Sequence, residues 1–229
     1  MAQKQSLVER YKPEMISDFA GLTKTKAILK ALARSPYDSA WAFLGPSGIG
    51  KTTMALALCN GIGAMLHHIP SRNCNLETVE AVVHDCWYKP LFGGDWHVVL
   101  IDEADQMTKA AQLAFLSKLD TTAKPPNTIF VFTMNDTKGL EDRFLSRMRT
   151  LHFAAPTVEE SVEWLEGIWR KETTAAVPDC KAIFEQACGN LRQALMELEL
   201  ELLTVEVSKP KVQTVTDRFG RTMFVPAMA

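Results

Sequence analysis

The chain has 229 residues, of which 47% are hydrophobic and 23% charged, and its formal net charge is −2. This length suffices for one α/β core with a small accessory domain. The balanced charge gives no support for nucleic-acid binding over the whole surface and leaves room for a local basic patch. Because no apolar run is long enough for a membrane span and the polar start is not a secretory signal, we expect a cytoplasmic protein without a membrane partner.

Hydrophobic periodicity predicts the elements of the first two thirds of the chain. Residues 1–20 are mixed, with a small apolar cluster at Met15, Ile16 and Phe19. From there helices and short apolar strands alternate. The predicted helices are 22–34, 51–59, 76–87, 109–119 and 140–147, and the predicted strands are 41–44, 64–69, 96–101, 128–133 and 150–153. This alternation is typical of an α/β fold, a parallel sheet with helices on both faces.

After Pro156 the pattern changes to helices only, at about 157–171, 179–188 and 190–204. Segments 211–215 and 222–225 flank a turn-like Asp217–Gly220 and could form a β-hairpin or a mobile tail. We therefore expect three parts: a nucleotide-binding core at 1–155, a small all-helical domain at 156–205, and a tail or hairpin at 206–229.

The five cysteines are odd in number and include no CxxC pair, which favours reduced thiols in a cytosolic compartment. Several metal-ligand residue types lie close together in the chain: His67, His68, Cys74, His84 and Cys86. Their spacing matches no familiar zinc pattern, so the sequence favours ordinary side chains over a zinc site.

A glycine-rich loop follows the first predicted strand. It reads Gly45-Pro46-Ser47-Gly48-Ile49-Gly50-Lys51-Thr52 and matches the pattern G-x-x-x-x-G-K-[ST]. Such glycines let backbone N–H groups surround phosphates, and the following helix presents its positive end to the same charge. Lys51 would reach the β- and γ-phosphates of ATP, and the Thr52 hydroxyl would bind Mg²⁺. These residues and Thr53 form the predicted nucleotide-binding loop, which a position between strand and helix favours over a ligand-free turn.

An acidic pair, Asp102 and Glu103, directly follows the apolar strand 96–101. The carboxyl ends of buried strands face the crevice where open α/β sheets bind ligands. Asp102 would hold Mg²⁺, mainly through water, and Glu103 would orient and polarise the attacking water. The alternative, a helix N-cap with acidic residues in the first turn, is disfavoured by the phosphate loop elsewhere in the chain.

Polar residues at three further places in the chain are candidates. Asn135 ends the strand 128–133 and could hydrogen-bond the γ-phosphate or the attacking water, with a plain turn asparagine as the alternative. Arg143, Arg147 and Arg149 form either a solvated face or an arginine finger that reaches a neighbouring subunit. Arg192 begins the last predicted helix, and alone it means little.

Together these residues resemble an AAA+ ATPase of the clamp-loader clade, similar to replication factor C small subunits and to bacterial and phage clamp-loader motor subunits. The resemblance runs from about residue 7 to 204. It is carried by the opening Glu9-Arg10-Tyr11-Lys12-Pro13, Asp18–Gly21, the acidic box Ile101–Thr108, the sensor 1 strand Pro126–Asn135, Leu145-Ser146-Arg147-Met148 and the sensor 2 run Gly189–Arg192.

The resemblance implies roles for individual residues. Tyr11 and Pro13 would contact the adenine, Asn135 would be the sensor, and Arg147 would be the arginine finger. Arg192 would be the arginine of a helical lid that contacts the γ-phosphate in cis. Met148 stands where the family usually has cysteine, a difference that should not disable the arginine.

The family also implies partners: other AAA+ subunits in an oligomer, DNA, and a sliding clamp or other replication protein. Arg72, Thr108 and Lys109 match the family's DNA channel and could hold a phosphate backbone, with ordinary caps and surface charges as the alternative. We expect an ATPase acting in DNA replication or repair. The chain is too short for the family's collar domain, which leaves two alternatives: a nucleotide-dependent switch such as a helicase loader or regulatory adaptor, or an ATPase core whose collar lies on another chain.

Overall fold

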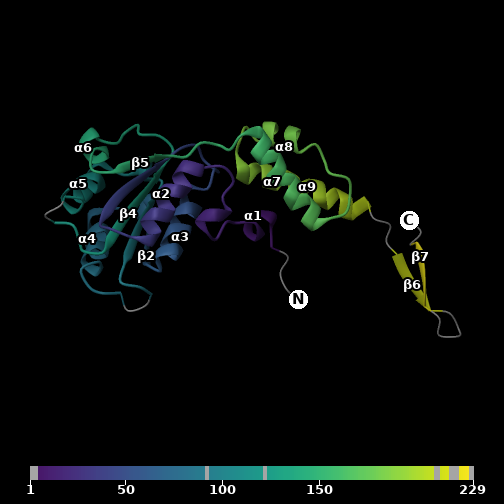
Figure 1. Ribbon diagram of the computed structural model, residues 1–229, viewed down its shortest axis with the longest axis horizontal. Coiled ribbons are helices and arrows are strands. Elements are labelled where there is room, and N and C mark those ends of the chain that lie inside the picture. The colour runs from purple at the N-terminus through teal and green to yellow at the C-terminus, as the bar shows by residue number, and fades with distance from the viewer. Residues whose placement is uncertain (1–4, 91–92, 121–122, 209–211, 217–221, 227–229) are drawn as a thin grey trace.

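A computed structural model describes residues 5–90, 93–120, 123–208, 212–216 and 222–226 (Figure 1). Its helices are α1 (Leu7–Arg10), α2 (Thr23–Arg34), α3 (Lys51–Ile62), α4 (Leu76–Asp85), α5 (Lys109–Lys118), α6 (Asp142–Leu145), α7 (Val158–Glu172), α8 (Cys180–Gln186) and α9 (Leu191–Ser208). Its strands are β1 (Ser39–Leu44), β2 (Met65–Pro70), β3 (His97–Asp102), β4 (Thr128–Met134), β5 (Arg149–His152), β6 (Val212–Thr216) and β7 (Thr222–Pro226). Three 3₁₀ turns complete these elements: η1 (Ile16–Asp18), η2 (Ser71–Asn73) and η3 (Ala104–Gln106). Within the described ranges, no helix combines the length and apolarity that crossing a membrane requires.

Five strands form one parallel sheet in the order β2-β3-β4-β1-β5. The side chains of β1, β3 and β4 are buried on both faces of the sheet. The exceptions are the last residues of β1 and β3, which are partly exposed. Because a parallel sheet is covered by helices on each side, such strands read as continuous apolar runs. The predicted α/β class with helices on both faces is confirmed.

Two hydrophobic clusters cover the two faces. On one face Phe115 of α5 packs edge-on against Phe130 and Phe132 of β4, in a cluster that includes α4. On the other face Leu58 of α3 packs with Phe43 of β1, in a cluster that includes α2. Alternating strand residues serve opposite clusters, as the period of two along a strand requires.

A third cluster joins α7, α8 and α9, which Figure 1 shows on the opposite side of the molecule from α5 and α6. The short helix α1, which the sequence pattern did not reveal, belongs to this cluster. Leu7 is fully buried among the three helices, and its N–H donates to Glu199 Oε1 at 3.2 Å. The helix α1 therefore packs against the helical part, because its one fully buried apolar side chain, Leu7, has its contacts there.

The boundaries of the predicted parts at 155 and 205 stay predictions. The helix α9 continues to Ser208, past the predicted end of the helical part. Strands β6 and β7 pair antiparallel, with Val212 opposite Pro226, and they lie beyond the end of α9, away from the sheet (Figure 1). The expected turn at Asp217–Gly220 lies outside the described residues.

Candidate nucleotide-binding site

The predicted phosphate loop connects β1 to α3 at the carboxyl end of the sheet. Gly50 has φ +92°, a left-handed conformation that favours glycine, and it directly precedes α3. A Cβ on Gly45 would lie 2.1 Å from the carbonyl oxygen of Phe153, so glycine allows this close approach of the loop to the end of β5. The loop thus lies over the N-terminus of α3, where exposed N–H groups and the helix dipole favour an anion.

Lys51 is buried at the start of α3, with only 8% of its surface exposed. Its Nζ donates to the carbonyl oxygens of Gly45 and Pro46, both at 2.7 Å, and to Asn135 Oδ1 at 2.9 Å. Asn135 follows β4, the strand next to β1. Strand order therefore brings the predicted P-loop lysine and the predicted sensor into direct contact.

Charges of both signs surround Lys51. Burial lowers the pKa of Lys51, the carboxylates of Asp105, Asp102 and Glu103 oppose that shift, and the cation of Arg192 lowers it further. Arg192 at the start of α9 therefore lies close enough to Lys51 to repel its charge. A negative group between two cations reduces their mutual repulsion. A phosphate bound between Lys51 and Arg192 would have this effect.

The carboxylate of Asp102 lies at the centre of a short hydrogen-bond network. Its Oδ1 accepts from Thr52 Oγ1 at 2.6 Å and from Thr133 Oγ1 at 2.5 Å. The Thr133 hydroxyl in turn accepts the backbone N–H of Glu103 at 3.0 Å. Glu103 has φ +56°, a left-handed conformation that is uncommon for this residue type and that such bonds help to hold. The hydroxyl of Thr52 and the carboxylate of Asp102 are oxygen donors of the kind that Mg²⁺ prefers.

Two adjoining cavities occupy this end of the sheet. The larger, of about 430 Å³, lies between the sheet and the helical part and is lined by apolar side chains that include Phe19, Leu56 and Trp164. The smaller, of about 160 Å³, is lined mostly by polar groups that include Lys51 and Glu103. Both are lined by Gly48, Gly50, Thr52, Thr53, Asp102 and Arg192. A mainly apolar cavity that adjoins a polar one is complementary in polarity to a planar base joined to phosphates.

The predicted adenine residues Tyr11 and Pro13 line the larger cavity. The hydroxyl of Tyr11 donates to Glu172 Oε1 at 2.7 Å, and Glu172 also pairs with Arg10 at 2.7 Å. Burial and the neighbouring carboxylate raise the pKa of Tyr11 to about 12. These contacts tie the wall of the cavity to α7, so the site is built from both parts of the chain.

Of the predicted loop residues, Ile49 lines the larger cavity and Ser47 the smaller one. Asn135 also lines the smaller cavity, and its backbone N–H donates to Asp105 Oδ1 at 3.2 Å. The carbonyl of Pro46 is already bonded to Lys51. The predicted loop residues from Ser47 to Thr53 thus each line at least one of the two cavities, whereas Gly45 and Pro46 line neither and accept hydrogen bonds from Lys51.

Arg147, the predicted arginine finger, lies elsewhere. It follows α6, its Nη1 donates to the carbonyl of Arg143 at 2.9 Å, and its Nη2 lies 3.6 Å from Asp120 Oδ2. Neither cavity is lined by Arg147. The structure therefore does not bring Arg147 to the site of its own chain.

The predicted DNA contacts lie at the carboxyl ends of β2 and β3. Arg72 is exposed in η2, which packs against η3, and Lys109 is exposed at the start of α5. Thr108 caps α5, since its Oγ1 accepts the N–H of Ala111 at 3.3 Å. The structure thus gives Thr108 the capping role that was the alternative, and this role leaves its predicted contact with DNA untested.

Sequence reasoning missed two residues at this site. The hydroxyl of Thr133 donates a hydrogen bond to Asp102. A polar side chain at the end of an apolar strand was the feature of the sequence from which this site residue could have been predicted. Asn190 lies against Gly48, where a Cβ would fall 2.0 Å from Asn190 Oδ1. No local sequence pattern predicts that contact, because it depends on how the helical part packs against the phosphate loop.

Comparison with known proteins agrees with this geometry. The family model described as "ATPase family associated with various cellular activities (AAA)" matches residues 41–154. The replication factor C small subunit of Methanothermobacter thermautotrophicus is 28% identical, and the match covers 84% of this chain and 61% of that protein. Replication factor C small subunit 2 of Pyrobaculum aerophilum is 27% identical, over 96% of this chain and 72% of that protein. The chain thus spans under two thirds of the length of the first of these relatives.

Among solved structures the chain is similar to the Thermotoga maritima RuvB Holliday junction branch migration motor. The TM-score is 0.69 at 20% sequence identity, over 86% of this chain and 67% of that one. At this identity the likeness shows the fold alone.

Proposed function

We propose that this chain, which belongs to the clamp-loader clade of AAA+ ATPases, binds and hydrolyses ATP as one subunit of an oligomer in DNA replication or repair. One observation carries the proposal. Lys51, Thr52, Asp102 and Asn135 converge on a polar cavity that adjoins an apolar one. This arrangement suits a nucleoside triphosphate.

In the proposed complex the adenine lies in the larger cavity, near Tyr11, Pro13 and Trp164, and the phosphates lie at the N-terminus of α3. Lys51 exchanges its contacts with the loop carbonyls for phosphate oxygens. Thr52 and Asp102 would hold Mg²⁺, whose charge offsets that of the phosphates.

Hydrolysis requires a water in line with the γ-phosphate. In our proposal Glu103 orients that water and Asn135 hydrogen-bonds it or the γ-phosphate. The water oxygen bonds to the γ-phosphorus as its proton passes to Glu103, the bond to the bridging oxygen of ADP breaks, and the electron pair of that bond remains on ADP. Arg192 contacts the γ-phosphate from α9, so the helical part closes over the sheet when ATP is bound.

We propose that Arg147 completes the site of a neighbouring subunit. Its position outside both cavities of its own chain supports a role in trans. An arginine supplied in trans raises the rate by about 10³-fold or more, so isolated subunits should turn over slowly.

The proposed partners are other AAA+ subunits, DNA and a sliding clamp or similar replication protein. Arg72, Thr108 and Lys109 would contact the phosphate backbone of DNA without reading bases. We would measure ATP hydrolysis with and without primed DNA over a range of salt concentrations. We expect DNA to raise the rate of ATP hydrolysis and this increase to become smaller as the salt concentration rises. A rate that does not respond to DNA at any salt concentration would contradict the role in DNA metabolism.

A second candidate is a switch whose nucleotide state controls another protein. It is favoured by the β6–β7 pair, which extends away from the sheet beyond α9 (Figure 1). Removing the residues after Ser208 tests it: loss of a protein partner with an unchanged response to DNA would favour the switch. The mass of the assembly with a non-hydrolysable ATP analogue separates the two, since a ring or spiral supports the trans arginine and a monomer supports the switch.

A further inference from the structure

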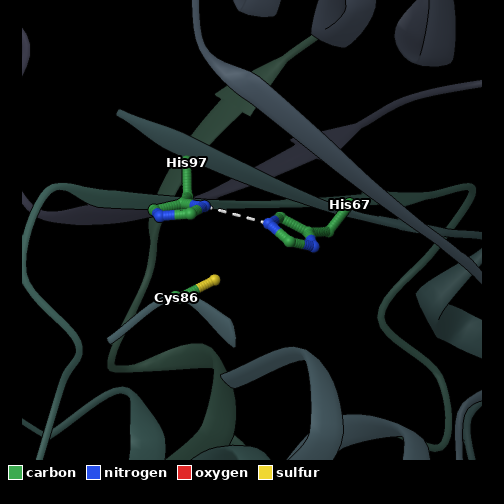
Figure 2. A group of neighbouring side chains, drawn as sticks. All are labelled: His67, Cys86 and His97. Atoms are coloured by element: carbon green, nitrogen blue, oxygen red, sulfur yellow. Dashed lines mark hydrogen bonds between the residues drawn. The ribbon is translucent and has the colours of Figure 1, made fainter. Parts of the chain in front are cut away.

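Three side chains from three elements, none of which lines the two cavities of the proposed nucleotide site, lie close together (Figure 2). His67 lies on β2, His97 begins β3, and Cys86 caps the end of α4. In the register of the two strands Met65 lies opposite His97, so His67 is two residues further along the same face. The helix α4 packs on that face. The ligand atoms of all three side chains lie within 4.8 Å of one another.

The hydrogen bonds of the two histidines organise the cluster. Nε2 of His97 lies 2.8 Å from the carbonyl oxygen of Tyr88, so this nitrogen carries the proton and Nδ1 presents its lone pair. That lone pair faces His67 Nε2 at 2.9 Å. A histidine whose second nitrogen donates to a backbone carbonyl is the usual arrangement for a metal ligand, because the bond fixes the tautomer and the ring.

The cluster is buried and yet reachable. Cys86 and His97 are 1% and 2% exposed, but both line a cavity of about 180 Å³, near whose rim Trp87 and Tyr88 are exposed. A cavity beside the donors can admit an ion and supply a further ligand from solvent.

We propose that His67, Cys86 and His97 bind a transition-metal ion of the Zn²⁺ type, with its remaining position directed to the cavity. Two imidazole nitrogens and one thiolate suit zinc, whereas Thr52 and Asp102 in the nucleotide site offer the oxygen atoms that suit Mg²⁺. Three protein ligands leave a tetrahedral ion one open position.

Binding releases one proton to solvent. Two metal–nitrogen bonds and one metal–sulfur bond form, the Cys86 S–H loses its proton to solvent, and the proton on His67 Nε2 is replaced by one on Nδ1 through exchange with solvent, so that the imidazole stays neutral. Because Cys86 is buried, the ion itself must displace the thiol proton. The two histidine nitrogens must also move apart by roughly a few tenths of an ångström to become two ligands of one tetrahedral ion. The bound ion would join the edge strand β2 to β3 and to the end of α4.

Cobalt provides a direct test because a Co²⁺–thiolate bond absorbs in the near ultraviolet. The full chain, stripped with a chelator and free of nucleotide, would be titrated with Co²⁺ alone and then with Zn²⁺. We expect one Co²⁺ per chain, a thiolate absorption band, and displacement by Zn²⁺. The band should vanish in Cys86→Ser, weaken with at least about tenfold lower affinity in His67→Gln, and persist in the matched control Cys74→Ser, a buried cysteine outside the cluster.

Thermal unfolding gives a second readout. Zn²⁺ should raise the unfolding temperature of the parent chain and of Cys74→Ser, and should leave that of Cys86→Ser unchanged, because an ion that binds only the folded state stabilises it. A Co²⁺ band that survives in Cys86→Ser, or a parent chain that binds no Co²⁺, would overturn the site. If Cys86→Ser does not fold, His67→Gln carries the same comparison from a half-buried position. Neither readout depends on ATP, so the site and the proposed ATPase can fail separately.

Discussion

The side chain of Asn190 lies directly on the phosphate loop at Gly48: a Cβ there would fall 2.0 Å from Asn190 Oδ1. Asn190 precedes α9, and its Oδ1 also accepts the N–H of Gln193 at 3.2 Å. Arg192, two residues further along, lines both cavities. The proposed phosphate loop and the start of α9 are therefore in contact at Gly48, where the absence of a side chain leaves room for Asn190.

Gly48→Ala should disrupt that contact. Gly48 has φ +80°, so alanine adds about 1–2 kcal/mol of backbone strain as well as the collision with Asn190. We expect ATP-analogue binding to weaken by at least about tenfold, which corresponds to about 1.4 kcal/mol, in a titration with a fluorescent analogue.

Gly139→Ala is the matched control for that variant. Gly139 has φ +82° with nothing within 4 Å of a Cβ, so it carries the strain without the collision. It should lower stability and leave nucleotide binding unchanged. Gly48→Ala combined with Asn190→Ala should recover part of the lost affinity. If the double variant binds no better than Gly48→Ala, the contact with Asn190 is not what limits binding.

Thr133→Val should slow hydrolysis more than it weakens ATP binding. It removes the hydroxyl that bonds to Asp102 and to the backbone of Glu103, while keeping the shape of a fully buried side chain. We expect kcat to fall by about tenfold or more and unfolding free energy by about 1–3 kcal/mol. Steady-state ATPase kinetics and chemical denaturation measure the two effects. Thr128→Val, at the opposite end of β4, should share only the second effect, and equal losses of kcat would argue against a role for Thr133 at the site.

Arg147→Ala should nearly abolish hydrolysis, by about 10³-fold, and leave nucleotide binding intact. Arg143→Ala, four residues earlier and paired with Glu141, is the control and should stay active. Mixing Arg147→Ala subunits with Lys51→Ala subunits should restore activity, because each supplies what the other lacks at a shared interface. Mixtures as inactive as their components would exclude a trans arginine.

Tyr11→Phe should change the alkaline stability profile. A group whose pKa is raised in the folded state contributes stability that is complete below its unfolded pKa and is lost as pH rises through its folded pKa. For Tyr11 that interval runs from about 10.0 to about 12, because burial disfavours the phenolate and ionisation would also place it beside Glu172. Denaturant unfolding at a series of pH values should show the parent chain more stable than Tyr11→Phe below pH 10, with the difference shrinking toward pH 12. A difference that stays constant over this interval would contradict the predicted hydrogen bond.

Several elements could be predicted from the sequence because their signals are local. The run Trp41–Leu44 is wholly apolar, and β1 is indeed buried on both sides. The helix predicted at 22–34 is α2, Thr23–Arg34. By contrast α1 has only four residues, too few for helical periodicity, and Leu7 is ordered by α7, α8 and α9.

The candidate sites divide in the same way. Glycine spacing and the Lys51-Thr52 pair identify a phosphate loop without knowledge of the fold, because the loop conformation is set by neighbours in the chain. The zinc-type cluster shows the opposite case. His67 and Cys86 were recognised as possible ligands, but His97 was not, since its place beside them depends on the register of β2 and β3.

The sequence by itself determined the alternating strands and helices, the phosphate loop and the acidic pair, because periodicity and local backbone conformation are properties of short segments. The tertiary structure decided which side chains meet. Lys51 and Asn135 are 84 positions apart and lie 2.9 Å from each other because β4 pairs with β1. That pairing results from burying apolar surface over the whole sheet, and such a global balance is not encoded in any one segment.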